Sequence, residues 1–264
     1  AIVVLTFLFF WFMSFWGDKL WFDSLGFTQR FWIEIGAKAG FILAGVIVSG
    51  ILIYALTSPI DKRNIFFRYL ALGIGVLYGG IWGHSNWEVI LQFFNSVSSG
   101  IIEPILQKDA AFYMFRLPFY KELVAFFIVV FIISIAGLLL SLYSQDNMGE
   151  KLSYEEINYM GVKIGRSLVI AGSLFFIALA FQKYLARFDL LYSDWGSVSG
   201  PGWTDVHVRF PVYLISSLLT LLIGLSFFLP FTRRRFIGRL KKYRIQPYNL
   251  VPSLFWISFG AILI

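Results

Sequence analysis

Two polar residues near the end of this apolar sequence have the types that catalysis or metal binding requires. Asp205 and His207 are separated by one residue, and a carboxylate beside an imidazole can orient a general base or share a metal ion. Two ligands make a weak metal site, because structural zinc sites use four. The other interpretation is that Thr204 and Asp205 cap the helix that follows and brace the loop before it. We expect capping and bracing here.

A second possible constellation joins residues that lie far apart in the sequence. His84 ends an apolar run and could approach His207, with Asp109 or Glu103 nearby, and such a set would suit Zn²⁺. The simpler interpretation is an interfacial histidine bonded to backbone or water. Asp109 precedes an aromatic run and is expected to brace a turn, with binding of an extracytoplasmic partner left open. The candidate binding residues are therefore His84, Asp109, Asp205 and His207, and no catalytic residue, metal or cofactor is assigned.

Motifs that would identify a common enzyme class are missing from the sequence. It has no cysteine, which excludes disulfides, thiolate metal sites and a cysteine nucleophile. It also lacks a phosphate-binding loop of the GxxxxGKS type, an HExxH pair and a GxSxG turn. Its two histidines give little support for axial haem ligation. The sequence therefore favours a role other than catalysis.

The composition points to a membrane protein. Hydrophobic residues make up 58% of the 264 residues and charged residues 14%, against about 25% charged in a soluble domain. Uncharged runs are long enough to cross a bilayer as helices, which takes roughly 20 residues. Barrel strands would instead alternate apolar and polar residues. We expect an all-α bundle of about seven spans, at residues 1–17, 39–60, 69–87, 123–145, 167–185, 210–232 and 247–264.

Lysine and arginine in the loops predict the orientation. The loops at 58–68, 146–166 and 233–244 together hold 13 basic residues, and the alternate loops hold 8. Cytoplasmic loops carry the excess, so the N-terminus is expected in the cytoplasm of a prokaryotic inner (plasma) membrane or an internal membrane such as a thylakoid. The last of these loops is expected to bind anionic lipid headgroups rather than nucleic acid, through Arg233, Arg234, Arg235, Arg239, Lys241, Lys242 and Arg244.

Three glycines in the third run predict close helix packing. Gly75, Gly79 and Gly83 recur every four residues, and small residues at this spacing let two membrane helices approach closely. The partner helix could belong to this chain or to another membrane subunit. We expect a partner within the chain.

Two outer loops, 88–122 and 183–209, are long yet rich in apolar residues. In the first, apolar residues recur at helical spacing, which predicts an amphipathic helix lying in the membrane interface: Trp87, Ile90, Leu91, Phe94, Val97 and Ile101. An aromatic belt follows at 112–120. We expect short interfacial helices in both outer loops.

Both outer loops also carry a family resemblance. The segment Glu103–Tyr120, EPILQKDAAFYMFRLPFY, resembles a "DPxFxxDxxFYxFxLPFY" signature, and Gly200–Pro211, GPGWTDVHVRFP, resembles "GAxYTDVxxxLP". Trp32 fits an early "LGYxxxFW" pattern. Together they resemble uncharacterised protein family 0182, a group of polytopic prokaryotic membrane proteins. Glu103 stands where the signature has Asp, and Gly-Pro-Gly stands where it has Gly-Ala-Ser.

The resemblance implies an architecture rather than an activity. It implies seven spans followed by a large extracytoplasmic region, and the chain begins with Ala and stops inside an apolar run, so we expect it to be part of a longer protein. The first functional hypothesis is a membrane anchor or scaffold that presents outer loops to a partner complex. The alternatives are a transporter or channel for a lipid or small solute, with Pro247 and Pro252 breaking the seventh span, and an outer-face enzyme using Asp205 and His207.

Overall fold

The computed structural model describes the chain except for residues 1, 61, 148–153, 193–199 and 230–264. The described residues form helices and no strand beyond one isolated bridge, so the predicted all-α fold is confirmed. The α-helices are α1 (Ile2–Ser24), α2 (Thr28–Thr57), α3 (Ile65–Ser85), α4 (Trp87–Phe94), α5 (Leu117–Asn147), α6 (Tyr154–Ala186) and α7 (Phe210–Ser226). Four short helices complete them: the 3₁₀ turns η1 (Lys62–Asn64) and η3 (Arg187–Tyr192), and the π-helical turns η2 (Phe112–Arg116) and η4 (Asp205–Arg209).

Five helical segments in the described part of the chain are long and apolar enough to cross a membrane. They are Thr28–Thr57, Ile65–Ser85, Phe112–Ser144, Val162–Tyr192 and Asp205–Ser226, and they coincide with the second to sixth predicted spans. Residues 2–17 of the first predicted span lie within α1. The seventh lies outside the described residues, so the total of seven stays a prediction.

Helix α2 begins earlier than its uncharged run predicted. The segment 18–38 between the first two predicted spans is largely helical, because α1 continues to Ser24 and only a three-residue turn at 25–27 precedes α2. Gly26 adopts φ 75° in this turn, a conformation that glycine adopts at little cost. The charged residues at the start of α2 are accommodated because Lys38 donates to Glu34 (2.6 Å) and lies 4.9 Å from the centre of the Trp87 ring.

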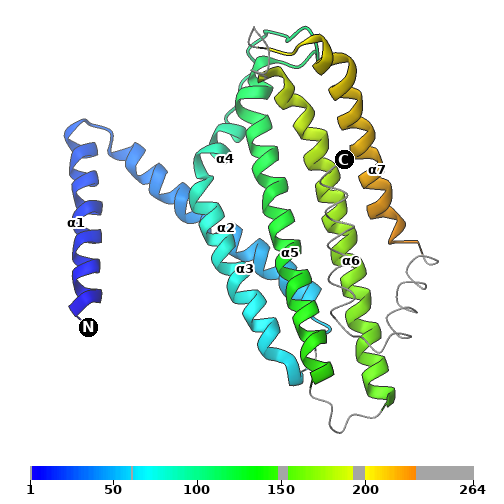
Figure 1. Ribbon diagram of the computed structural model, residues 1–264. Helices are drawn as coiled ribbons and strands as arrows, with labels where there is room; N and C mark the ends of the chain where they lie inside the picture. Colours follow the sequence, from blue (N-terminus) through cyan, green and yellow to red (C-terminus); the bar gives the residue numbers. More distant parts are fainter. Residues whose placement is uncertain (1, 61, 148–153, 193–199, 230–264) are drawn as a thin grey trace.

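The long helices alternate in direction between two ends of the molecule (Figure 1). One end holds the α1–α2 turn, α4, the segment 95–111, η3 and η4, and we call it the α4 end. The opposite end, which holds η1, is called the η1 end. Helices α3 and α6 run toward the α4 end, whereas α5 and α7 both run away from it. The described parts of the two long predicted outer loops therefore lie at the same end.

Glycines bring α2 and α3 into backbone contact. A Cβ at Gly79 would overlap the carbonyl of Gly45, and a Cβ at Gly83 would overlap the carbonyl of Phe41. At the third position, Gly75, a Cβ would collide with the side chain of Ile53. The helix that faces this glycine series is thus α2 of the same chain. Such close approach gains van der Waals contact, which is the main attraction between helices in lipid.

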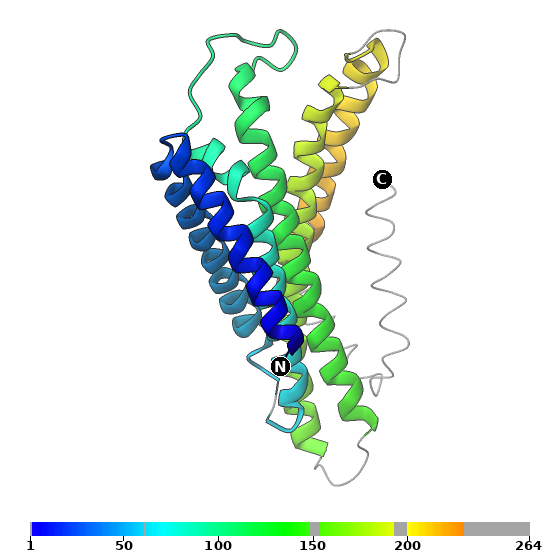
Figure 2. The ribbon, with the colours of Figure 1, turned by 90° about the vertical axis from the view of Figure 1, so that its left-hand side faces the viewer.

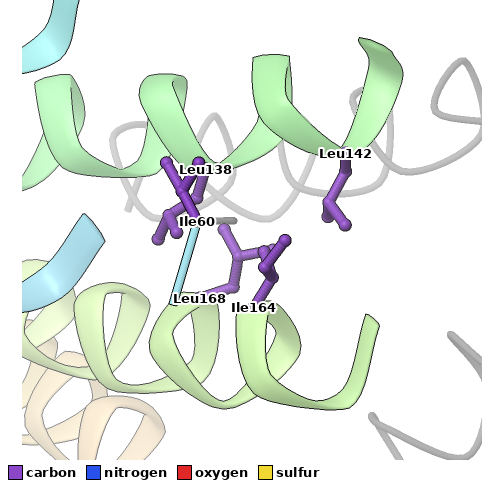
Figure 3. Packing of buried hydrophobic residues seen from close by; sticks show 5 residues of the cluster. All are labelled: Ile60, Leu138, Leu142, Ile164 and Leu168. Carbon is purple, nitrogen blue, oxygen red and sulfur yellow. The ribbon is translucent and has the colours of Figure 1, made fainter. Parts of the chain in front are cut away.

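At the η1 end, apolar side chains join α5 to α6. Leu138 and Leu142 of α5 point toward Ile164 and Leu168 of α6, with Ile60 from the turn after α2 beside them (Figure 3). Nearby, the Asn64 side chain donates to the Ser141 carbonyl of α5 (3.0 Å). A third junction, between α6 and α7, uses the Ser173 hydroxyl, which donates to the Gly224 carbonyl. These contacts make α5 and α6 the centre of the bundle.

Helix α1 stands at the edge of the bundle, beside α2 (Figure 2). Its packing centres on Phe31 of α2, whose ring lies 5.5 Å from that of Phe15 and 5.7 Å from that of Phe22. Much of the rest of α1 is exposed and apolar, including Phe9, Phe12 and Leu20. An exposed surface of this kind suits contact with lipid.

Candidate functional site

The segment 95–111 at the α4 end is ordered around one carboxylate. Asp109 accepts hydrogen bonds from the hydroxyls of Ser98 and Ser99, the latter at 2.7 Å. Its oxygens also accept the backbone N–H groups of Ser99 and Gly100, both at 3.1 Å, and of Ala111 at 2.7 Å. Five donors therefore converge on a single side chain and close the loop upon itself.

These donors favour the charged form of Asp109. The hydroxyls of Ser98 and Ser99, followed by the amide of Ala111, hold the pKa of the Asp109 carboxyl well below its ordinary value. The carboxylate therefore stays ionised at physiological pH and is fully used as an acceptor. The prediction that Asp109 braces a turn agrees with this geometry.

A second carboxylate shapes the tip of the same loop. Glu103 accepts the backbone N–H groups of Ile105 (2.7 Å) and Leu106 (2.6 Å). The Tyr113 hydroxyl also donates weakly to it, at 3.4 Å. The turn is closed by the Glu103 N–H bonded to the Lys108 carbonyl (2.9 Å). Glu103 therefore couples the loop tip to the π-helical turn η2.

Aromatic packing fixes this loop to the bundle. Tyr113 and Leu117 of the η2–α5 junction form a buried cluster with Leu185 of α6 and Phe188 of η3. The Phe188 ring lies 5.0 Å from that of Phe112, in an edge-to-face arrangement. Such pairs add about 0.5–1.5 kcal/mol each beyond their buried area. The first loop is thus joined to the end of α6.

Charged groups reinforce this junction. The Lys121 ammonium pairs with the carboxylate of Asp189 in η3. The Arg187 guanidinium donates to the Tyr184 hydroxyl (2.6 Å) and lies 4.6 Å from the centre of the Phe188 ring. These contacts connect α5, α6 and η3 at the α4 end.

Large apolar side chains on the same loop remain uncovered. Val97, Ile101 and Ile102 are 78%, 69% and 66% exposed. Phe94, Ile105 and Met114 are exposed beside them. We call these six residues the exposed apolar set. Asp109 and Glu103 bond backbone amides between Ser99 and Ala111, and Phe94 and Met114 lie in the helices at the two ends, so the segment that carries this set is ordered.

The amphipathic helix of this loop is shorter than predicted. Helix α4 ends at Phe94, and its apolar face buries Trp87 and Ile90 against the bundle. Val97 and Ile101 lie beyond it in irregular structure. The helix predicted from apolar spacing is therefore wrong after Phe94. The amides of Ser99 and Gly100 donate to the Asp109 carboxylate, and these bonds compete with the bonds of a helix.

Asp205 braces the second loop in a way that differs from simple capping. Its Oδ2 accepts the Gly202 N–H (3.0 Å) and its Oδ1 accepts Arg209 (2.9 Å). Thr204, the other predicted cap, makes no side-chain capping bond. Asp205 instead resembles the third helical residue of a capping box, whose side chain bonds back to the first amide.

His207 is held by its own helical turn. Its Nδ1 lies 2.9 Å from the Trp203 carbonyl oxygen, and its ring stacks on the Trp203 ring at 4.4 Å. His84 is exposed in the last turn of α3. In both views α3 ends near α4 while α7 begins on the other side of α5 (Figures 1 and 2).

Within the part of the chain that the structure describes, no three histidine or acidic side chains gather in a way that could hold a metal ion. The grouping of His84 and His207 with an acidic residue does not form there. The predicted headgroup residues at 233–244 lie outside the described residues.

Sequence reasoning missed two connections at the α4 end. Glu103 was noted only as a possible metal ligand, although the Glu-Pro step is typical of a turn, where a carboxylate can accept the following amides. The pairing of Lys121 in α5 with Asp189 in η3 joins residues far apart in the sequence, and no local pattern carries that information.

Comparison with known proteins places residues 1–261 within the model of an uncharacterised protein family, UPF0182. A UPF0182 protein of Geobacter sulfurreducens is 30% identical over 230 residues, covering 75% of this chain and 25% of its own length. One from Tropheryma whipplei is 32% identical over 167 residues, covering 62% of this chain and 17% of its own length. The chain thus spans a quarter or less of these relatives. No solved structure matches it.

Proposed function

Because the chain belongs to the uncharacterised family UPF0182, whose name states no activity, we propose a function from the structure itself: the protein is a membrane anchor or scaffold that presents its α4 end to a partner protein complex. The observation that carries this proposal is the exposed apolar set on an internally braced loop. Exposed apolar patches on ordered surfaces commonly mark interaction sites.

The geometry supports binding rather than chemistry at this loop. Its carboxylates at Asp109 and Glu103 are occupied by hydroxyl and amide donors of the loop itself. A carboxylate satisfied in this way is poorly suited to act as a proton acceptor for a substrate. Association can instead use the apolar side chains, which contribute about 25 cal/mol for each Å² removed from water.

We propose further that the α4 end faces the outside of a prokaryotic inner membrane, with the N-terminus in the cytoplasm. This orientation follows from the basic residues of the alternate loops. The membrane lipids would then contact the spans, and other membrane subunits would contact the α4 end.

Site-specific photo-crosslinking in native membranes tests the anchor proposal. A photoreactive residue replacing Ile101, in the exposed apolar set, is expected to give one discrete protein adduct of the full-length protein, identified by mass spectrometry. The same residue at Leu77, which is exposed on α3, is expected to give lipid adducts only.

Two variants that each introduce one negative charge test whether the adduct depends on the exposed apolar set. Val97→Asp is expected to reduce the adduct at position 101 at least about tenfold, since a carboxylate in a dry interface is costly. Gln92→Asp introduces the same charge on the exposed side of α4 without removing an apolar contact, and should leave the adduct unchanged. Lipid adducts alone at position 101, or equal loss in both variants, would reject the proposal.

A further inference from the structure

One five-residue pattern occurs twice in the chain, each time where a loop at the α4 end enters a long helix. Arg116-Leu117-Pro118-Phe119-Tyr120 opens α5, and Arg209-Phe210-Pro211-Val212-Tyr213 opens α7. Both follow the order arginine, apolar, proline, apolar, tyrosine. The loops that precede them differ in length and composition, so the pattern belongs to the entry into the helix.

The backbone adopts the same unusual conformation at both places. The π-helical turn η2 lies directly before Leu117, whose N–H bonds to the Phe112 carbonyl five residues back. The turn η4 lies directly before Phe210, whose N–H bonds to the Asp205 carbonyl, again five residues back. These are the two π-helical turns among the described residues, and each ends two residues before a proline.

Proline explains the π-helical turn and makes it a weak point. A proline inside a helix has no N–H to donate, and its ring clashes with the carbonyl four residues back. Widening the preceding turn moves that carbonyl, which is Met114 before Pro118 and His207 before Pro211. A helix with a missing bond and a π-helical turn bends there more easily than elsewhere.

Matching contacts surround the two turns. The apolar residue before each proline is buried, with Leu117 2% and Phe210 8% exposed. The arginine before it is exposed and bonds to a polar group of its own loop: Arg116 to the Ser96 hydroxyl at 3.4 Å, and Arg209 to Asp205. Each turn is thus anchored on its loop side and packed on its helix side.

The two turns also occupy equivalent places in the fold. In each case a helix running toward the α4 end, α3 or α6, is followed directly by a short helix, α4 or η3, then by a loop, the π-helical turn and a helix running back (Figure 1). Helices α5 and α7 are therefore parallel and lie on either side of α6.

We propose that these two turns are a matched pair of hinges, about which the segments that precede them, 95–111 and 200–204, tilt against the membrane-spanning helices. The turn η2 is held in its present position by Phe188 of η3, which packs against Phe112 and Tyr113, and the ion pair between Lys121 and Asp189 fixes η3 to α5. Breaking the ion pair loosens η3 and thereby its contact with η2, whereas removing the prolines stiffens both hinges.

Hydrogen exchange of the full-length protein in lipid nanodiscs tests the hinges. Backbone amides at 112–117 and 205–210 are expected to exchange about tenfold faster than those at the centres of α5 and α7, since local opening needs fewer broken bonds there. The double variant Pro118→Ala/Pro211→Ala is expected to slow both segments about tenfold. Pro201→Ala, in the loop outside any helix, is the control and should leave both unchanged.

A variant that is expected to speed amide exchange, rather than slow it, keeps the test decisive if the proline variants fold poorly. Asp189→Asn is expected to raise exchange at 112–117 by several fold through loss of the ion pair, without changing the centre of α5. Junction amides as slow as the helix centres in the unmodified protein would overturn the proposal. So would a response at only one of the two turns to the double proline variant.

Discussion

Asp109 shows how one side chain can order a loop. The pKa of its carboxyl in the folded loop lies below the ordinary value of about 3.9. The network therefore stabilises the folded loop fully above the ordinary pKa. This stabilisation is lost only as the pH falls through the lower pKa of the folded loop. An amide at this position keeps one acceptor oxygen and adds two donors, which face the donors of Ser99, Gly100 and Ala111.

We therefore expect Asp109→Asn to loosen the loop at every pH, whereas the unmodified loop keeps its order from pH 7 down to about pH 4.5. The chain has no cysteine, so a single spin label at Lys108→Cys reports loop mobility. Its spectrum should be constant over this range in the unmodified loop and more mobile in the Asp109→Asn variant. Equal mobility in the two would contradict the role of the network.

Asn64 makes a buried hydrogen bond at the η1 end. It is 2% exposed and its amide donates to the Ser141 carbonyl at 3.0 Å. Asn64→Ala is expected to lower the free energy of unfolding by about 1–2 kcal/mol, measured by denaturant titration in micelles. Asn95 donates to the Leu91 carbonyl at 2.8 Å on the exposed surface, and Asn95→Ala should cost less than about 0.5 kcal/mol.

At the scale of elements, the packing of α2 on α3 depends on missing side chains. Gly79→Ala would force its methyl group into the Gly45 backbone, and we expect a loss of about 1–3 kcal/mol in the free energy of unfolding. Gly73 lies in the same helix with open space around its Cβ position. Gly73→Ala should therefore leave stability unchanged or raise it slightly. Equal effects of the two variants on the free energy of unfolding would contradict the role of the close approach between α2 and α3.

Helix boundaries were predicted well where charge and hydrophobicity changed together. The run at 69–87 agrees closely with α3, whereas α2 and α5 begin far before their uncharged runs. The difference has a physical reason in each case. The pair of Glu34 and Lys38 satisfies its own charges within α2, and the start of the long helical segment at Phe112 is stabilised by packing against Phe188 of η3.

For the whole molecule, the orientation in the membrane is the property that most affects function. Lys62→Cys at the η1 end and Lys108→Cys at the α4 end each replace one exposed lysine, so the two variants are matched in charge. We expect an impermeant maleimide to label Lys108→Cys in intact cells and to label Lys62→Cys only after the membrane is opened. The reverse pattern would place the α4 end in the cytoplasm and remove the proposed outer docking surface.

The amino-acid sequence by itself determined that this chain is a helical membrane protein, because stretches this long and apolar have no stable place in water and must satisfy their backbone hydrogen bonds within helices. It also predicted close packing at Gly79, since spacing on a helix follows from local geometry. The tertiary structure decided which helix faces that glycine, that Asp109 closes its loop, and that Lys121 meets Asp189. These contacts join residues distant in sequence, and their energies depend on the relative positions of whole helices.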